Sequence, residues 1–282
     1  MNFTTLENIP QSVITDCFNE GFSDYAVDIS ATDEYLSQRW QIGGVDFSLS
    51  GGAWIDEKLV GIVIIMVNEV EGILTAFNGA TCVRPEARGQ AATQRIFEFL
   101  IPKFKERNIK KAQLEVLEGN DRAIVVYEKV GFRANRKLLC FKEKENISSI
   151  SKIDKNIQIE ECSSINPSKY NSWKTNKTGW EQSDATVINF PKKHRFFTVK
   201  SEQKIISYII VCPGSKLISQ ILISPEHRLN DIGNTVFSYL RSLNLPTRQI
   251  NIGENSKELI KFLLNTGFDN YINQFEMLMS LD

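Results

Sequence analysis

Apolar residues along the first half of the chain follow two alternating periods. Runs rich in β-branched and aliphatic residues predict strands at 3–9, 48–55, 59–67, 73–83, 112–117 and 132–142. Apolar residues at helical spacing predict helices at 10–22 and 32–40, and a third helix that starts near residue 94. A fourth helix is expected between Asn120, a good N-cap, and Gly131, a good C-terminal stop. Strands interleaved with helices in this way predict an α/β fold with a mixed sheet.

The stretch from residue 73 to residue 117 reads as strand, tight turn, helix, strand. A strand–helix–strand crossover places its two strands parallel in one sheet. The turn between the first strand and the helix directs several backbone N–H groups, together with the positive end of the helix dipole, at one point. The sequence therefore predicts a place where a phosphate can bind without any catalytic side chain.

The second half of the chain repeats the plan of the first. Val83-x-Pro85-Glu86-x-Arg88 returns 140 positions later as Ile223-x-Pro225-Glu226-x-Arg228. Gly131-Phe132 returns 136 positions later as Gly267-Phe268. Two matched blocks in one order, with a four-residue length change between them, indicate a tandem duplication. We expect a first domain at 1–148, a polar linker at 149–156 and a second domain at 157–282.

Two segments of the first half resemble motifs of the GNAT superfamily of N-acetyltransferases. Val83-x-Pro85-x-x-Arg88-Gly89-Gln90-Ala91-Ala92-Thr93 resembles the acyl-CoA loop of that family, and Asn120-x-x-Ala123-Ile124-x-x-Tyr127-Glu128-x-x-Gly131-Phe132 resembles its second motif. The loop departs from the usual Arg-x-x-Gly-x-Gly/Ala pattern, because Ala91 and Thr93 stand where small glycines are common. The resemblance implies two tandem GNAT-like acyl-CoA N-acyltransferase domains, of which the second is degenerate.

The resemblance also implies acetyl-CoA as the acyl donor and assigns residues to it. The residues expected to contact coenzyme A are Cys82, Val83, Arg88, Gly89, Gln90, Ala91, Ala92, Thr93, Gln94, Asn120 and Tyr127. Backbone groups of the strand would pair with the pantetheine arm as an added strand does. Asn120 has a second interpretation, that of a simple helix cap.

Two residues are candidates for acid–base chemistry. Tyr127 matches the tyrosine that the family uses to protonate the coenzyme A sulfur, although a tyrosine there could also pack the helix against the sheet. Glu115 lies in a Leu-Glu-Val strand similar to that of enzymes that acetylate the N-terminal alanine of a ribosomal protein, where the glutamate is the base. A salt-bridged or solvated carboxylate is an equal alternative for Glu115. The carboxylates near the start of the chain (Asp24, Asp28, Asp33 and Glu34) could attract an ammonium substrate, but a solvated surface is the favoured interpretation.

The second half lacks the residues that carry the chemistry in the first. At the matched positions Ala91, Glu115, Asn120 and Tyr127 become Asp231, Asn251, Ser256 and Leu263. A carboxylate at Asp231 would oppose a pyrophosphate, and Leu263 cannot donate a proton. We therefore expect a structural role for the second half, with Trp173 and Trp180 either lining an acceptor cleft or buried in the core.

The composition of the chain argues against several classes of binding partner. The 282 residues are 42% hydrophobic and 24% charged, with a net charge of −1, so bulk electrostatics favours neither a nucleic acid nor an acidic membrane. Five scattered cysteines and two histidines show no metal-ligand spacing, so no metal is expected, and the thiols are typical of a cytoplasmic protein. Homo-oligomerisation is left open.

The sequence leads to one main function and two alternatives. The main hypothesis is an acetyl-CoA-dependent N-acetyltransferase that acts on the primary amine of a small molecule. The first alternative, suggested by Leu114-Glu115-Val116, is a protein N-terminal acetyltransferase of the alanine type. The second, suggested by Ala91 and Thr93, is a non-catalytic acyl-CoA sensor or scaffold. The acceptor and the acyl-chain preference are not specified.

Overall fold

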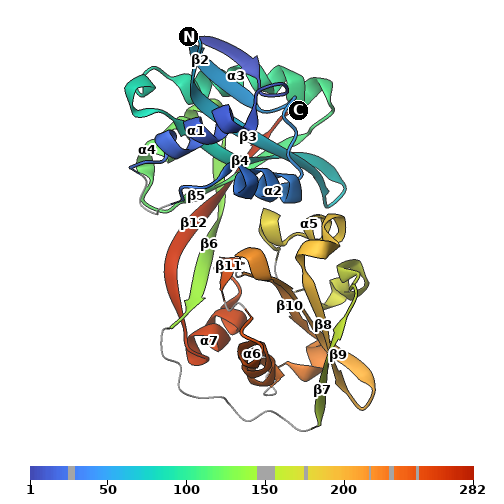
Figure 1. Cartoon of the computed structure of the whole chain (residues 1–282). Coiled ribbons are helices and arrows are strands. Elements are labelled where there is room, and N and C mark those ends of the chain that lie inside the picture. Colours follow the sequence, from blue (N-terminus) through green and yellow to red (C-terminus); the bar gives the residue numbers. More distant parts are fainter. Residues whose placement is uncertain (25–28, 145–155, 175–176, 216, 229–231, 246–247) are drawn as a thin grey trace. The chain divides into compact units, whose positions relative to one another are not determined.

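The chain divides into two compact units in the computed structural model. One consists of Met1–Asn135 together with Phe275–Asp282, and the other of Arg136–Gln274. The structure describes residues 1–24, 29–144, 156–174, 177–215, 217–228, 232–245 and 248–282. Both chain termini belong to the first unit (Figure 1).

The first unit is built on a mixed sheet. Its first five strands lie in chain order, β1 (Asn2–Thr5), β2 (Gly51–Ile55), β3 (Lys58–Val70), β4 (Ile73–Val83) and β5 (Lys111–Leu117). The neighbours are antiparallel except for β4 and β5, which are parallel, as the crossover predicted. The expected α/β class with a mixed sheet is confirmed.

Four helices cover the two faces of this sheet (Figure 1). They are α1 (Gln11–Gly21), α2 (Asp33–Gly43), α3 (Ala92–Glu106) and α4 (Asp121–Val130). Apolar side chains of α3 and α4 share one core with alternate residues of the strands, whereas no residue of α1 or α2 belongs to that core. The predicted helices and strands of this half are confirmed, with bounds that differ by a few residues.

The last strand of the chain completes the sheet of the first unit. In the strand order, β12 (Phe268–Ser280) lies between β5 and β6 (Arg133–Glu143). Met277, Met279 and Leu281 belong to the core that α3 and α4 form. The Leu281 N–H donates to the Lys110 carbonyl oxygen at 3.0 Å.

The compact units therefore differ from the domains expected at 1–148 and 157–282. The end of β12 belongs to the first unit, and β6 from Arg136 onward belongs to the second. Local patterns predict that a strand forms but not which distant strand pairs with it. The sequence therefore could not predict that the end of β12 joins the first unit and most of β6 joins the second. The linker expected at 149–156 lies outside the described residues apart from Asn156.

The second unit has a four-stranded antiparallel sheet. Its order is β10 (Leu217–Ile223), β9 (Lys204–Cys212), β8 (Arg195–Ser201) and β7 (Ile157–Cys162). The chain continues through α6 (Ile232–Ser242), β11 (Gln249–Gly253) and α7 (Lys257–Asn265). Strand β11 pairs antiparallel with the second part of β6, where Ile252 lies opposite Leu139. Between β7 and β8 the structure has short helices, η2 (Pro167–Trp173), η3 (Trp180–Gln182), α5 (Asp184–Asn189) and η4 (Pro191–Lys193).

The duplication inferred from the sequence is visible in hydrogen bonds. A short 3-10 turn, η1 (Pro85–Ala87) or η6 (Pro225–His227), follows the matched strands. The Arg88 Nε donates to the Val83 carbonyl oxygen at 3.1 Å, and the Arg228 Nε donates to the Ile223 carbonyl oxygen at 3.3 Å.

The matched cores agree as well. The rings of Phe97 and Phe132 meet edge to face with centroids 5.5 Å apart, and those of Phe237 and Phe268 do so at 5.0 Å. Edge-to-face pairs are favoured by the ring quadrupoles. Each pair ties a helix that follows the 3-10 turn to the start of a later strand, so both units are built by the same packing.

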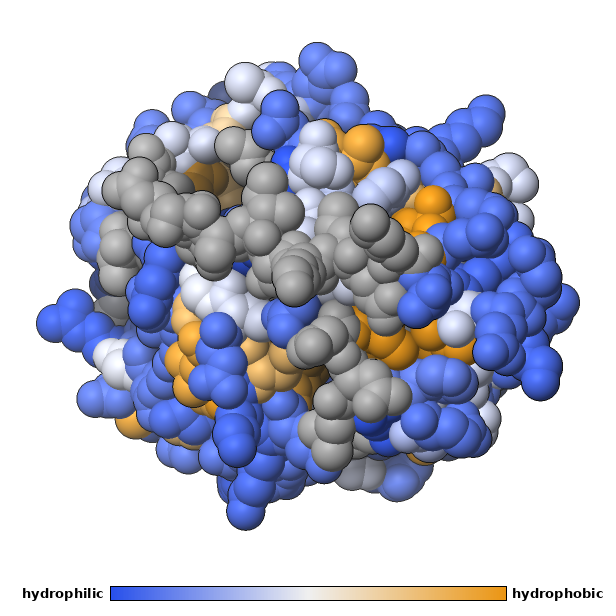
Figure 2. Space-filling view, turned by 90° about the horizontal axis from the view of Figure 1, so that it is seen from below, coloured by the Kyte–Doolittle hydropathy of each residue, from blue (hydrophilic) through white to orange (hydrophobic). Residues whose placement is uncertain are grey.

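Most of the visible surface is hydrophilic. The face shown in Figure 2 carries hydrophobic atoms only in small separate areas. No helix among the described residues is both long and apolar enough to cross a membrane.

Candidate functional site

The two parallel strands of the first unit separate at one point. Pairing between β4 and β5 runs from Thr75 opposite Lys111 to Asn78 opposite Leu114 and goes no further. Residues 80–83 of β4 remain paired with β3 on the other side. The edge of β4 that faces β5 therefore has no strand beside it over residues 79–83 among the described residues. Such an edge can accept an extended ligand as an added strand, which fits the predicted roles of Cys82 and Val83.

A β-bulge marks the point of separation. The register of β4 against β3 shifts between Asn78 and Ala80, so Gly79 is the extra residue. The same shift recurs between Ile218 and Gln220 in β10, where Ser219 is the extra residue. Bulges bend a strand and raise its local twist, and they are frequent beside binding sites. The bulge lies directly after the last β4–β5 pair, so a bend there accounts for the separation of the strands.

The turn after β4 leads into the N-terminus of α3. The first hydrogen bond of this helix is donated by the Arg95 N–H to the Ala91 carbonyl oxygen at 3.0 Å. The N-cap residue Ala91 makes no side-chain capping hydrogen bond. The N–H groups of Ala92, Thr93 and Gln94 precede the first helical bond and are oriented along the helix axis. A helix end of this kind binds anions such as phosphate.

Two residues of the turn have positive φ angles. Gly89 has φ of 76° and Ala91 has φ of 56°. A Cβ at Gly89 would meet no atom within 4 Å, so glycine serves the backbone conformation there rather than a close contact. For Ala91 the left-handed conformation costs about 1–2 kcal/mol. Gln90 and Ala91 are exposed, Ala92 is buried in the core, and Thr93 and Gln94 are half-buried.

Arg88 connects the turn to the end of α1 and to Asp24 through hydrogen bonds. Its guanidinium forms a two-point ion pair with Asp24 at 2.6 and 2.8 Å, and its Nη2 also donates to the Gly21 carbonyl oxygen at 3.0 Å. The hydrogen bond from Arg88 lowers the pKa of the Asp24 carboxyl. Predicted as a coenzyme A contact, Arg88 thus binds α1 and the residues after it to the end of β4.

Arg84 was not singled out from the sequence and adds a second tie. Its side chain is almost fully buried and its Nε donates to the Leu59 carbonyl oxygen at 2.8 Å. The guanidinium forms ion pairs with Asp16, at 2.6 Å, and with Glu20 on α1. The sequence did offer a signal for this buried arginine, because Arg84 comes two residues after Cys82, which lies in a strand that was predicted to be apolar. Together the two arginines hold α1 against the strand that leads into the turn.

Tyr127 has its ring in the core and its hydroxyl at the separation point. The ring meets those of Phe97 and Phe132 with centroids 6.3 and 6.0 Å away. The Asn78 Nδ2 donates to the Tyr127 hydroxyl oxygen at 3.4 Å, and Asn78 is the last β4 residue paired with β5. The packing interpretation of this tyrosine is therefore confirmed, and its role as an acid stays a prediction that the position of the hydroxyl at the separation point allows.

Glu115 is the first residue of β5 beyond the last pair with β4. Leu114 and Val116 face the core of α3 and α4, so the Glu115 side chain is on the opposite face of the sheet. It is half-buried, and its Oε1 is shielded from solvent. Tyr127 and Glu115 thus approach the separation point from the two opposite faces of the sheet.

Two other predicted contacts have clear local roles. The Asn120 Oδ1 accepts from the Ala123 N–H at 3.3 Å, which makes Asn120 the N-cap of α4. Cys82 is a free thiol, and burial raises its pKa well above the usual value. A thiol held protonated is a poor nucleophile, so the Cys82 sulfur is unsuited to covalent chemistry, and the backbone contact expected of Cys82 stays a prediction.

The acidic segment near the start of the chain is only partly described. Asp24 is paired with Arg88, and Asp33 and Glu34 lie in the exposed first turn of α2. Asp28 lies outside the described residues. Among the described residues, no group of three or more histidine, cysteine or acidic side chains is arranged to hold a metal.

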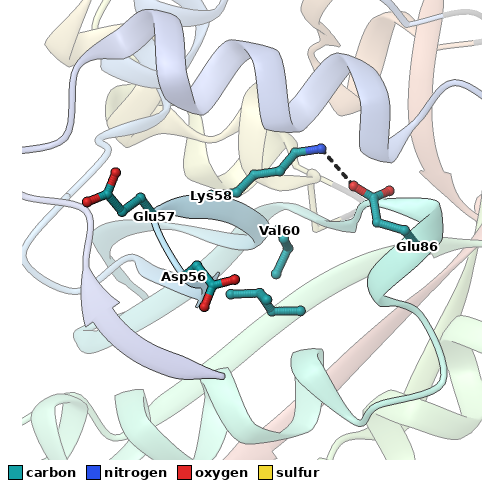
Figure 3. Close-up of a pocket in the computed structure, with 6 residues that line it drawn as sticks. Asp56, Glu57, Lys58, Val60 and Glu86 are labelled. Carbon is teal, nitrogen blue, oxygen red and sulfur yellow. Dashed lines mark hydrogen bonds and ion pairs between the residues drawn. The ribbon is translucent and has the colours of Figure 1, made fainter.

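A shallow pocket of about 570 Å³ lies elsewhere in the first unit (Figure 3). Its lining comes from the end of β2, the β2–β3 turn, the start of β3 and η1, and consists of Ile55, Asp56, Glu57, Lys58, Val60 and Glu86. Lys58 and Glu86 neutralise each other at 2.8 Å (Figure 3). None of the predicted site residues lines this pocket, so it is separate from the candidate site.

The matched region of the second unit is closed by its own chain. Leu217 of β10 forms one isolated parallel bridge with Arg248, the residue before β11. The Gln220 Nε2 then donates to the Gln182 carbonyl oxygen at 2.8 Å, and the Asn251 Nδ2 donates to the Gln182 Oε1 at 3.5 Å. Gln182 therefore links the two strands at the place where the first unit leaves them apart.

Other expectations for the second unit can be placed only in part. Leu263, which matches Tyr127, is fully buried, and Ser256 is the N-cap residue of α7. Trp180 is buried, and Trp173 packs beside a smaller core with Tyr170. Asp231, which matches Ala91, lies outside the described residues.

Comparison with known proteins agrees with this architecture. Residues 12–132 match the model of the acetyltransferase (GNAT) family. That range begins in α1 and ends at Phe132 after α4, so it includes the separated strands, the turn and Tyr127. No curated protein matches the chain.

Several solved structures have the fold of the whole chain. A tandem GNAT protein from the clavulanic acid biosynthesis pathway has a TM-score of 0.74 at 12% identity, covering 100% of this chain and 98% of that one. A GCN5-related N-acetyltransferase from Sphaerobacter thermophilus has a TM-score of 0.71 at 10% identity, covering 99% and 96%. Another from Anabaena variabilis has a TM-score of 0.62 at 12% identity, covering 100% and 73%.

The fold and the comparisons define the class: residues 12–132 match the GNAT family model, and the whole chain has the fold of a tandem GNAT protein. This family indicates an acyl-CoA N-acyltransferase, with an acyl thioester of coenzyme A as co-substrate.

Proposed function

We propose that the first unit transfers an acetyl group from acetyl-CoA to the primary amine of a small molecule. One observation carries the proposal: the separation of β4 and β5 has a tyrosine hydroxyl on one face and a carboxylate on the other. The helix end that could hold a pyrophosphate follows directly after β4. The residues present therefore suit an extended phosphate-bearing thioester.

The proposed reaction needs a base and an acid. An alkyl amine with a pKa near 10 is neutral in only about one molecule in a thousand at pH 7. Glu115, directly or through water, would take the ammonium proton before the nitrogen attacks the thioester carbonyl. Tyr127 would give its proton to the sulfur as the carbon–sulfur bond breaks. Acid–base help of this kind is worth roughly 10² to 10⁴ in rate.

The second unit has a structural role in this proposal. Its matched region is closed by Gln182, and Leu263 offers no proton. All five cysteines are free thiols, which supports a reducing compartment such as the cytoplasm.

Calorimetric titration with coenzyme A and acetyl-CoA, followed by thiol release with a panel of amines, tests the function. We expect binding of both and turnover with small primary amines. Turnover only with peptides that carry a free N-terminal alanine would replace this proposal with a protein acetyltransferase. Binding without turnover on any amine or peptide would replace it with an acyl-CoA sensor.

The acid is tested by Tyr127→Phe. We expect turnover to fall by about 100-fold or more, with coenzyme A affinity nearly unchanged. The matched control is Tyr208→Phe in the second unit, which also removes a buried hydroxyl bonded to a side-chain amide, that of Gln220 at 2.9 Å. Equal activity in Tyr127→Phe and the wild type would exclude Tyr127 from the mechanism.

The base is tested by Glu115→Gln, which keeps the shape of the side chain and removes its charge. We expect turnover to fall by about 100-fold at pH 7 and to recover in part as the pH rises and more of the amine is neutral. A uniform loss at every pH would mean that Glu115 positions the acceptor rather than accepting its proton.

A further inference from the structure

We infer that Asn78 is a positioning residue, which aims the Tyr127 hydroxyl at the thioester sulfur and stabilises the phenolate that forms. Thr81 holds Asn78 in the orientation that this role requires. The inference rests on the proposed function, because it gives Tyr127 the part of the acid. It adds two residues, Asn78 and Thr81, that lie outside both sequence motifs, 83–93 and 120–132.

Three side chains form one hydrogen-bonded chain on one face of the sheet. The Thr81 Oγ1 donates to the Asn78 Oδ1 at 2.9 Å, and the Asn78 Nδ2 donates to the Tyr127 hydroxyl oxygen at 3.4 Å. Asn78 and Tyr127 are each more than nine-tenths buried. Asn78 lies opposite Ile65 of β3, whose side chain belongs to the core of α3 and α4. The three hydrogen-bonded side chains therefore lie on the face of the sheet that carries Tyr127, at the last pair between β4 and β5.

The direction of the two hydrogen bonds matters. A side-chain amide has one end that accepts and one end that donates. Because Thr81 donates to the oxygen end, the nitrogen end of Asn78 faces Tyr127. The phenol oxygen then accepts from Asn78, and the phenol hydrogen must point to a different atom. A departing thiolate in the gap between the strands is such an acceptor.

The same hydrogen bond assists the proton transfer. When the carbon–sulfur bond of the tetrahedral intermediate breaks, the electron pair leaves with sulfur, and sulfur takes the phenol proton. The amide nitrogen releases its extra proton to solvent, and Tyr127, left as a phenolate, regains a proton from solvent, so that charge and protons balance. A hydrogen bond donated to the phenolate oxygen favours this charged form, and such charge-assisted bonds are roughly twice as strong as neutral ones. The contact from Asn78, long at 3.4 Å in the neutral state, is thus stronger when the acid has given up its proton.

The second unit shows that the fold does not need these three polar residues. At the matched positions, Asn78 and Thr81 are replaced by Ile218 and Ile221. Ile218 is fully buried in the second core, and Ile221 packs against it. Tyr127 is replaced by Leu263, also fully buried. All three members change to aliphatic residues together, while the β-bulge between the first two is kept. Buried polar groups that a duplicated fold can dispense with are best explained by chemistry in the unit that keeps them.

The test is a double-mutant cycle between Asn78→Leu and Tyr127→Phe. We expect Asn78→Leu to lower kcat by about tenfold, the loss of one charge-assisted hydrogen bond, with KM for acetyl-CoA changed less than twofold. In the Tyr127→Phe background, Asn78→Leu should change kcat by less than twofold, because the hydroxyl on which it acts is gone. Thr81→Val should lower kcat by about threefold, a weaker and indirect effect.

Thr75→Val is the matched control for Thr81→Val. Thr75 is also in β4, is buried, and donates from its Oγ1 to the Ile73 carbonyl oxygen at 2.9 Å. We expect its kcat to equal that of the wild type. Urea unfolding of Asn78→Leu should show a midpoint no lower than that of the wild type, since the second unit is built with isoleucine there.

A spectroscopic measurement does not depend on turnover. The carbon NMR chemical shift of the Tyr127 Cζ atom, assigned by the loss of its signal in Tyr127→Phe, reports the hydrogen bonding of the hydroxyl. We expect this signal to move in Asn78→Leu and to stay in place in Thr75→Val. An unmoved Tyr127 signal in Asn78→Leu would overturn the inference even if no acceptor amine had been found.

The outcomes separate this inference from the proposed function. If Tyr127→Phe leaves kcat unchanged, the acid assignment fails and this inference fails with it. If Tyr127→Phe lowers kcat but the effects of the two substitutions multiply, Asn78 acts independently of Tyr127, and only the inference is overturned.

Discussion

The two units of this chain treat the same place in the fold in opposite ways. In the first, β4 and β5 separate after Asn78, and a tyrosine hydroxyl and a carboxylate approach the separation from opposite faces. In the second, Gln182 links the matched strands through Gln220 and Asn251. The bulge, the 3-10 turn, the arginine and the phenylalanine pair are common to both. The comparison teaches that these shared features build the fold, whereas the fold does not require the polar residues at the separation, which are the ones we propose for function.

The largest expected effect comes from removing the strand that completes the first unit. A chain that ends at Gln274 lacks Met277, Met279 and Leu281, each almost fully buried. Burial of such side chains contributes roughly 1.5–3 kcal/mol each, and the sum is comparable with the whole stability of a domain, about 5–15 kcal/mol. We expect the first unit to lose cooperative folding and coenzyme A binding, as measured by hydrogen exchange and calorimetry.

The fragment 1–148 is the companion experiment, because it matches the first domain expected from the sequence. It lacks the same strand, so we expect it to be unfolded or aggregated. Addition of a peptide of residues 268–282 should restore part of the exchange protection of β5. A fragment that folds and binds coenzyme A alone would show that β12 is dispensable for the first unit.

The arginine common to both units should have different effects in each. Arg88→Met removes the contacts with Asp24, Gly21 and Val83 and leaves the turn to be ordered at the moment of binding. We expect coenzyme A affinity to fall roughly tenfold, measured by calorimetry. The matched variant Arg228→Met should change stability but not affinity. Equal losses of affinity in both would mean that the second unit takes part in binding.

A smaller effect is expected at Ala91, which holds a left-handed conformation at the start of α3. Ala91→Gly removes the steric cost of that conformation, so we expect a gain of about 1 kcal/mol in the free energy of unfolding. Thermal unfolding measures it, and coenzyme A affinity should stay the same or rise. The exposed α3 variant Glu98→Gly is the control, and it should lose about 1 kcal/mol because glycine is unfavourable inside a helix. A loss of stability in Ala91→Gly would contradict the strain.

The smallest expected effect is a pH dependence restricted to the second unit. Both histidines lie there, and burial lowers the pKa of His194 below its usual 6.5, while its Nδ1 is 2.9 Å from the Phe190 carbonyl oxygen. The unfolded chain therefore binds a proton near pH 6.5 that the folded state does not. Stability contributed by neutral His194 is present above about pH 6.5 and is lost as the pH falls toward the lower folded pKa. Hydrogen exchange at pH 7.5 and 5.5, corrected for intrinsic rates, should show a loss of protection in the second unit that His194→Gln abolishes.

Much of the fold could be predicted because it depends on residues that are close together in the sequence. The run 73–83 was predicted as a strand and is β4 within those bounds, and the helix between Asn120 and Gly131 is α4. The parallel pairing of β4 with β5 followed from the length and type of the connection. The duplication followed from two spaced motifs, and matched hydrogen bonds and ring pairs bear it out.

The site was predicted in its positions and less fully in its contacts. Tyr127 and Glu115 both lie at the separation of the strands, and their roles stay predictions. Asn78, a polar residue inside an apolar strand, was a signal that could have been used. The tie of Arg88 to Asp24 joins residues 64 positions apart, and no local pattern indicates such a pair.

The sequence by itself determined the order of the helices and strands, the repeat and the turn that leads from β4 into α3, because these follow from periodicity and from residues close together in the chain. Only the tertiary structure decided that the last eight residues belong to the first unit, that Tyr127 and Glu115 lie on opposite faces of one gap, and that Gln182 closes the matched gap in the second unit. The physical reason is that these features depend on contacts between distant segments. Such contacts are selected by the packing of the whole core and leave no periodic trace in the sequence.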